Sequence, residues 1–204
     1  MRIELESLAP PDIYDLMIQT IVPRPIAWVL SDNGDASFNL APFSFFNGVT
    51  SRPPTISISI GRRRDTTKKD TWRNIEERGH FVLHIPGREQ AGPVAQSAAS
   101  LPFGESEVTA GGITLAEEPG WPLPRVKASR VAMLCRRYQI VEIGEAPQGL
   151  IIGEILSVYL DDEITRPSGD AVPLISASGM DPLARLGGDD YCGLGPAFTV
   201  ERPD

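Results

Sequence analysis

A basic, hydroxyl-rich stretch at residues 62–71 is the part of the chain best suited to chemistry. It reads RRRDTTKKDT, in a chain whose formal net charge is −8 at pH 7. The stretch follows a predicted strand at residues 55–60 and precedes a predicted helix at residues 72–78. Cationic side chains, hydroxyl groups and the free N–H groups of a helix N-terminus together bind anions such as phosphate. Charge runs are also common in solvated loops, so the position between strand and helix is what favours an anion site.

The two histidines carry a weaker signal. His80 and His84 lie on either side of residues 81–83 in the strand predicted at 81–85, and their spacing of four puts both side chains on one face. No Asp or Glu with ligand spacing accompanies them, so we expect no metal site. His84 is a candidate functional residue because its charge changes near neutral pH, and a structural, hydrogen-bonded role is equally consistent.

Other catalytic patterns are absent from the sequence. There is no GxSxG or HExxH motif, and no Cys/His pair indicates nucleophilic hydrolysis. No GxGxxG opens a helix after a strand, so a Rossmann site is not predicted. If the protein is an enzyme, we expect a cofactor to supply its chemistry.

The bulk composition narrows the protein class. The 204 residues are 41% hydrophobic and 23% charged, which suits one compact domain over residues 1–204. We expect its core at residues 20–165 and a tail at 166–204 that packs on the core or on a partner subunit. The acidic balance argues against nucleic-acid binding. No run of about eighteen apolar residues predicts a membrane span.

The N-terminus and the cysteines bear on location. The first twelve residues, MRIELESLAPPD, lack the basic-then-apolar pattern of a signal peptide. Cys135 and Cys192 are the only cysteines, and two reduced thiols are the simpler interpretation. We therefore expect a cytoplasmic protein.

The order of predicted elements favours a mainly β fold. Strands are predicted at residues 26–30, 38–46, 55–60, 81–85, 128–145 and 149–161, with a short final strand at 197–201. Asn33-Gly34 is typical of a tight hairpin turn between the first two strands. Helices are predicted at residues 11–20 and 72–78, the second capped by Asp70 or Thr71 and ended by Gly79. Residues 88–100 are weakly helical in composition, and 101–124 are irregular. This pattern predicts a β-barrel of six or seven strands with a few peripheral helices.

Several motifs follow one another in a fixed order. They read RPIAWV from Arg24, NLAPFSFFN from Asn39, RPP from Arg52 and KDTxxNI from Lys69, and the tail contains RxGGxxY from Arg185. Together they resemble the flavin-reductase-like family of FMN-binding split barrels, over residues 23–203. The resemblance implies a Greek-key split β-barrel that forms a homodimer, with each FMN at the subunit interface.

The resemblance also implies a set of FMN-binding residues. Residues 39–42 would run beside the isoalloxazine ring and present backbone groups to its polar edge. Lys69 and Thr71 fit the phosphate, and one or more of the three arginines at 62–64 would assist. The candidate cofactor residues are Asn39, Leu40, Ala41, Pro42, Ser44, Ser59, Arg64, Lys69, Thr71 and Arg185. Arg185 would either cover the flavin from the partner subunit or hold the tail in place.

Two functions are consistent with this resemblance. The first is an FMN-dependent oxidoreductase that takes electrons from NADH or NADPH and reduces flavin or another small molecule. The second is a flavoredoxin-like carrier that holds FMN, meets a redox partner and has no nicotinamide activity. A flavin-free β-barrel binding module is a third, more distant alternative. In the sequence, His84 stands where the family frequently has asparagine.

Overall fold

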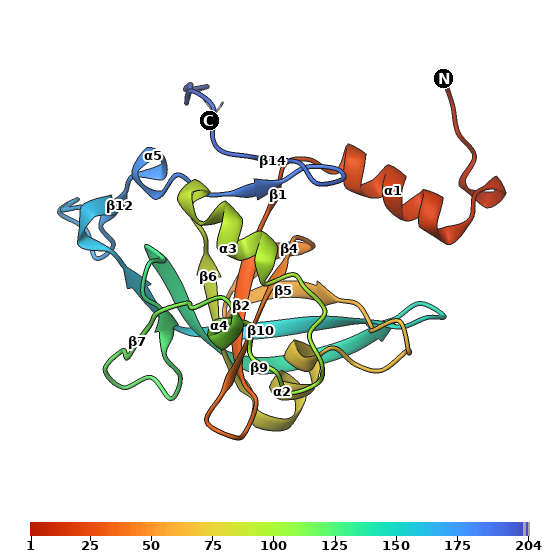
Figure 1. Cartoon of the computed structure of the whole chain (residues 1–204). Coiled ribbons are helices and arrows are strands. Elements are labelled where there is room, and N and C mark those ends of the chain that lie inside the picture. The colour runs from red at the N-terminus through yellow and green to blue at the C-terminus, as the bar shows by residue number, and fades with distance from the viewer. Residues whose placement is uncertain (202, 204) are drawn as a thin grey trace.

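The computed structural model describes residues 1–201 and 203. Its main sheet contains β2 (Ala27–Asp32), β3 (Phe38–Phe43), β4 (Phe46–Ser51), β5 (Pro54–Ile60), β6 (His80–Ile85), β9 (Val131–Ile143) and β10 (Gln148–Leu160). These seven strands are antiparallel in the order β3-β2-β6-β9-β10-β5-β4, so β3 and β4 form the two edges. Figure 1 shows β2 and β6 crossing the direction of β9 and β10, as expected for a strongly curved sheet.

Smaller elements surround this sheet. Short strands are β1 (Arg24–Pro25), β7 (Leu115–Ala116), β8 (Arg125–Val126), β11 (Thr165–Arg166), β12 (Leu174–Ile175), β13 (Ala184–Arg185) and β14 (Tyr191–Cys192). Helices are α1 (Pro10–Thr20), α2 (Asp70–Arg78), α3 (Ala91–Gln96), α4 (Glu107–Ala110) and α5 (Ala177–Met180). Short 3₁₀ turns occupy Leu5–Ser7, Arg88–Gln90 and Asp162–Ile164. In the described part of the chain, no helix is long and apolar enough to cross a membrane.

The two longest strands give the sheet its curvature. β9 and β10 are 13 residues each, and they pair with each other while β9 also pairs with β6 and β10 with β5. Their register shifts between Ile152 and Gly153 and again between Ile155 and Ser157. Bulges of this kind bend a strand and increase its twist. The same two strands can therefore belong to both halves of the barrel.

Strand β2, next to edge strand β3, is buried on both of its faces. Val29 belongs to one hydrophobic cluster, which includes Trp72 of α2, and Trp28 belongs to a second, which includes Val94 of α3 and Leu123. Helix α2 therefore packs on one side of β2. Helix α3 and the irregular segment that follows it cover the other side, which gives the excursion at residues 88–124 a structural role.

The sequence predicted most of these elements correctly. A mainly β fold of six or seven strands with few helices is confirmed, as is the antiparallel pairing of β2 with β3. The long strands predicted at 128–145 and 149–161 are β9 and β10. Helix α2 ends at Gly79 in the left-handed conformation, with φ of 81°, as predicted. The tail returns to the main body, where β13 pairs with β1.

Four predictions were wrong in detail. The strand predicted at 38–46 breaks at residues 44–45, so β3 pairs with β2 while β4 pairs with β5 at the opposite edge. The Asn33-Gly34 connection is a longer loop, in which Asn33 N–H donates to the Ser37 carbonyl at 3.0 Å. Residues 197–201 form no strand. Neither Asp70 nor Thr71 caps α2, because Lys69 occupies the N-cap position and no side chain caps the helix.

Candidate functional site

A cleft of about 670 Å³ opens between edge strand β3, the basic stretch, the start of α2 and the segment after α3. Its lining residues are Asn39, Ala41, Pro42, Phe43, 62–65, 69–71, 97–101 and Glu107. Six of the ten predicted cofactor residues therefore share one cleft: Asn39, Ala41, Pro42, Arg64, Lys69 and Thr71. They come from two segments of the chain, residues 39–42 and 64–71, which the fold brings together.

Three cations of the basic stretch are already paired inside the protein. Arg62 contacts Glu142 at 2.9 Å and lies 5.0 Å above the Trp72 ring. Arg63 Nη2 donates to Asp70 Oδ2 at 2.5 Å and Nη1 to the Leu101 carbonyl at 3.0 Å. Lys68 contacts Glu76 at 2.7 Å and also lies above Trp72. Their charges organise the loop and are largely compensated there.

Arg64 and Lys69 differ from these three. Within the described residues, neither side chain makes a hydrogen bond or ion pair, and both line the cleft. Desolvation, together with the positive charge of Arg63, lowers the pKa of Lys69. A bound anion would reverse both effects, because it stabilises the charged ammonium group. Arg64 and Lys69 are therefore the cations available to a ligand.

The N-terminus of α2 adds polar donors to the same place. The helix is nine residues long and starts at the cleft without a side-chain cap, which leaves its first N–H groups available to an anion. Thr71 Oγ1 accepts a hydrogen bond from Asn39 Nδ2 at 2.7 Å. Because that oxygen already accepts, its own proton is free to be donated to a ligand. Asn39 thus orients Thr71 from the neighbouring strand.

Behind Thr71, a buried polar network fixes this arrangement. Asn39 Nδ2 also contacts Ser31 Oγ at 3.3 Å. Asn74 Nδ2 donates to the same Ser31 oxygen at 3.2 Å and to Asn33 Oδ1 at 2.9 Å. Asn39, Ser31 and Asn74 are at most 3% exposed. Asn74 therefore holds β2 and α2 together.

The edge of β3 differs from expectation at Leu40. Its N–H donates to Glu107 Oε2 at 3.0 Å, and its side chain is fully buried in the second hydrophobic cluster. In an antiparallel pair, the N–H groups alternate between partner strand and free edge, so those of residues 39 and 41 face β2. Pro42 has no N–H. A ring that lies beside residues 39–42 would therefore meet backbone carbonyl acceptors and the surfaces of Ala41 and Pro42. Residues 39–42 would offer its polar edge no free backbone N–H donor.

Three further candidate residues lie outside the cleft. Ser44 Oγ accepts from Arg24 Nε at 3.2 Å. Ser59 lies in β5 opposite Leu150, and its N–H bonds the Phe45 carbonyl at 2.9 Å. Arg185 lies in β13, where its guanidinium is 4.4 Å from the Tyr191 ring and donates to the Gly188 carbonyl at 2.5 Å. Within one chain, Arg185 holds the tail in place.

His84 also lies away from the cleft and is fully buried. Its Nδ1 is 2.8 Å from the Trp28 carbonyl, and its Nε2 accepts from Val126 N–H at 2.9 Å. The ring must then carry its proton on Nδ1 and be neutral. Burial, assisted by the charge of Arg125, lowers its pKa to about 4. In this position His84 joins β6, β2 and β8.

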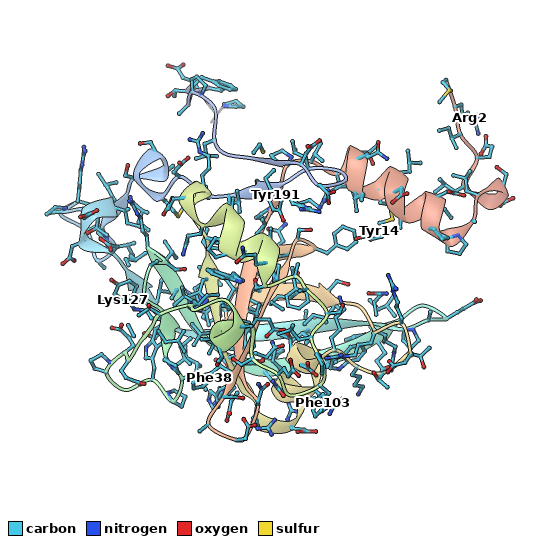
Figure 2. All side chains as sticks on the ribbon, in the orientation of Figure 1. Arg2, Tyr14, Phe38, Phe103, Lys127 and Tyr191 are labelled. Carbon is cyan, nitrogen blue, oxygen red and sulfur yellow. The ribbon has the colours of Figure 1, made fainter. Side chains whose placement is uncertain are left out.

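Sequence reasoning missed one wall of the cleft. Residues 97–101 and Glu107 line it, although the segment has no recognisable motif. Ser97 accepts from Trp28 Nε1 at 2.8 Å, and Ser106 donates to the Phe38 carbonyl at 2.6 Å. Phe103, labelled in Figure 2, packs under the Arg73 guanidinium of α2 at 3.6 Å. The only sequence signal was Ser106 before Glu107, which is a helix N-cap.

The curved sheet is that of a split barrel, and its cleft, lined by Arg64 and Lys69, lies beside an edge strand. Comparison with known proteins supports this description. Residues 19–180 match the flavin reductase like domain, and the chain belongs to that family. An uncharacterised protein of Halalkalibacterium halodurans is 34% identical over 207 residues, which cover 100% of this chain and 97% of the relative. The resemblance found in the sequence is thereby confirmed.

Solved structures share the whole fold. Nitrilotriacetate monooxygenase component B from Bacillus cereus is 32% identical, with a TM-score of 0.90 and 98% of each chain covered. The 2-nitrobenzoate 2-nitroreductase of Pseudomonas fluorescens is 27% identical, with a TM-score of 0.85 over 100% of this chain and 96% of that one. Flavoredoxin of Desulfovibrio vulgaris, at 22% identity and a TM-score of 0.75 over 98% of this chain and 97% of that one, shares the fold.

The burial of neutral His84 predicts acid sensitivity. An unfolded histidine has a pKa of about 6.5, whereas that of folded His84 is about 4. Between these values the unfolded state binds the extra proton, so stability is full above about pH 6.5 and falls by up to about 1.4 kcal/mol per pH unit as the pH drops. Urea unfolding from pH 7 to 4 measures this slope. His84→Asn should flatten it, whereas His80→Asn should keep it. An unchanged slope in His84→Asn would assign the acid sensitivity to other groups.

Proposed function

We propose that the protein binds FMN and acts as a flavin-dependent oxidoreductase that uses NADH or NADPH. The observation that carries this proposal is the coincidence, in one cleft, of two cations that pair with no described residue and an uncapped helix N-terminus beside the surface of β3. A phosphate dianion suits the first part, and the flat face of an isoalloxazine suits the second. Membership of the flavin reductase like family supports flavin as the ligand.

The residues present fit the phosphate end of FMN. Lys69 and Arg64 supply positive charge, Thr71 supplies an oriented hydroxyl proton, and α2 supplies N–H groups. From there the ribityl chain and ring would follow β3 past Ala41 and Pro42. Ala41 is small enough to allow close approach, and Pro42 carries no N–H that would be left unpaired under a ring.

Bound FMN would supply the electron-transfer chemistry, and the protein would supply binding and orientation. The cleft contains no histidine, and hydride transfer to a flavin needs no separate protein acid or base. The nitroreductase and monooxygenase-component names of two structural relatives are consistent with reductase activity. Nicotinamide as the electron donor is an inference from the family. Free thiols at Cys135 and Cys192 suit a reducing cytoplasm.

We further propose that the active form is a homodimer that completes the flavin site. Helix α1 stands away from the barrel in Figure 1 and has no buried residue, although its apolar residues follow helical spacing. Tyr14, Met17 and Ile21 are 55%, 40% and 52% exposed. Figure 2 shows Tyr14 on the side of α1 that faces the barrel. The Tyr14 ring lies 6.2 Å from that of Phe45, but much of this apolar surface stays exposed in one chain and is well suited to a second copy.

The phosphate assignment predicts a selective loss of FMN. Lys69→Ala and Arg64→Ala should each weaken FMN binding about tenfold or more, because each removes a charge-assisted contact. Titration of flavin fluorescence measures the dissociation constant. Lys68→Ala is the matched control: it removes the same charge from the adjacent lysine, which is already paired with Glu76. If Lys68→Ala and Lys69→Ala weaken FMN binding equally, the cause is the lower overall positive charge. That result would refute the assignment of Lys69 to the phosphate.

The visible spectrum tests the function itself. The purified protein should show flavin absorption bands that bleach without oxygen when NADH or NADPH is added, and the effective donor identifies the nicotinamide. Bands that persist with both donors and bleach with dithionite would instead establish an FMN-holding electron carrier. A protein that neither contains nor binds FMN would refute both flavin functions and leave a binding module.

The dimer proposal is tested by mass. Sedimentation equilibrium should give twice the 22.2 kDa of one chain. Met17→Glu places a charge on the exposed apolar face of α1 and should shift the protein toward the monomer and weaken FMN retention. Gln19→Glu, on the same helix, adds the same charge outside that apolar set and should do neither. A monomeric wild-type protein with full FMN retention would contradict the proposal.

A further inference from the structure

Glu107 is a buried carboxylate that the proposed function leaves unused. It is the first residue of α4, is 8% exposed, and lines the cleft. Oε2 accepts from Leu40 N–H at 3.0 Å, and within the described residues Oε1 has no hydrogen-bond partner. A carboxylate has about four acceptor positions, and most of those on Glu107 are left open where the residue lines the cleft. Glu107 therefore has capacity to accept hydrogen bonds from a ligand in this cleft.

The position of Glu107 along β3 indicates which part of a ligand it meets. Asn39 marks the phosphate end, because it bonds Thr71 at the start of α2. A strand advances about 3.4 Å per residue, so Leu40 lies one step further along and Pro42 about 10 Å further. The Glu107 carboxylate, bonded to Leu40, thus lies between the phosphate end and the surface at Ala41 and Pro42. In FMN, the hydroxyl-bearing ribityl chain spans this interval.

We propose that Glu107 binds the hydroxyl groups of the chain that joins the phosphate and the ring of the nucleotide. This inference rests on the proposed FMN function and deepens it. Hydroxyl groups donate, and an ionised carboxylate only accepts, so the two are complementary. Such charge-assisted bonds are stronger than neutral ones. A ligand with an anion and a ring but without hydroxyl groups would leave Glu107 unsatisfied, which makes it a residue for specificity.

The charged neighbours of Glu107 are consistent with this role. Burial raises its pKa, the Leu40 N–H bond opposes that shift, and the negative charge of Asp70 adds to it while the positive charge of Arg63 opposes it. Asp70 is itself neutralised by Arg63 at 2.5 Å. Donation from ligand hydroxyl groups would stabilise the charged form. Experiments at about pH 8, well above the ordinary carboxyl pKa, therefore favour the ionised group.

A purely structural role is the competing explanation, and the chain offers a matched control for it. Ser106 precedes Glu107 and makes a similar bond to the same strand edge, from its Oγ to the Phe38 carbonyl at 2.6 Å. Ser106 is not among the residues that line the cleft. If α4 only covers the edge of β3, the two residues should behave alike. If Glu107 contacts the ligand, only its replacement should depend on ligand hydroxyl groups.

The experiment measures FMN dissociation constants for wild type, Glu107→Ala and Ser106→Ala by fluorescence titration. Each is repeated with an FMN analogue in which hydrogen replaces the ribityl hydroxyl groups. Glu107→Ala should weaken FMN binding about tenfold, the usual value of a hydrogen bond to a charged group, and change analogue binding less than about twofold, because the bond is already absent. Ser106→Ala should change the ratio of the two affinities by less than about twofold.

Each possible result either supports or refutes the role of Glu107. Equal losses for FMN and analogue in Glu107→Ala overturn the inference and leave an edge-covering role. If Glu107→Ala does not fold, Glu107→Gln keeps a bond to Leu40 while removing the charge, and it should still lose FMN affinity about threefold more than analogue affinity. Wild-type protein that binds FMN and its analogue equally well refutes this inference alone. Wild-type protein that binds neither refutes the proposed function and this inference with it.

Discussion

The buried contact between Asn39 and Thr71 is the constraint on which the cleft depends. It joins edge strand β3 to the first turn of α2, with Ser31 and Asn74 completing the network behind it. Buried polar groups must be hydrogen-bonded, so the members of this network have few alternative positions. That rigidity fixes three things together: the direction of the Thr71 hydroxyl, the aim of the α2 N-terminus, and the distance between the helix and the strand surface.

Ion pairs within the protein determine which positive charges remain available in the cleft. The chain carries a net charge of −8, yet five cations gather at residues 62–69. Glu142, Asp70 and Glu76 neutralise three of them and shape the loop. The remaining positive charge, on Arg64 and Lys69, is therefore concentrated at the uncapped helix end. An acidic protein can in this way attract one small anion while repelling nucleic acid, whose binding requires an extended basic surface.

Much of the fold and part of the site were predictable from the sequence because their signals are local. Alternating apolar residues predicted the strands, and the basic stretch predicted the cations that lie beside the start of a helix in the cleft. The errors come from contacts distant in sequence. The strand at 38–46 breaks where Ser44 meets Arg24, and Thr71 lies inside α2, behind the N-cap residue Lys69, where its hydroxyl bonds Asn39 of the neighbouring strand. The Leu40 N–H bonds Glu107, which is 67 residues away in the sequence. No local pattern reports such pairings.

Edge strand β3 combines two demands that usually conflict. An exposed edge invites pairing with other chains, so its backbone groups need cover. A binding surface for a flat ligand needs the neighbouring face to remain open. The segment after α3 meets both demands, since Ser106 and Glu107 occupy backbone groups of Phe38 and Leu40 while Ala41 and Pro42 stay at the cleft. Pro42 needs no cover because it has no N–H. The segment thus covers the Phe38 carbonyl and the Leu40 N–H, and the Glu107 carboxylate that does so also lines the cleft.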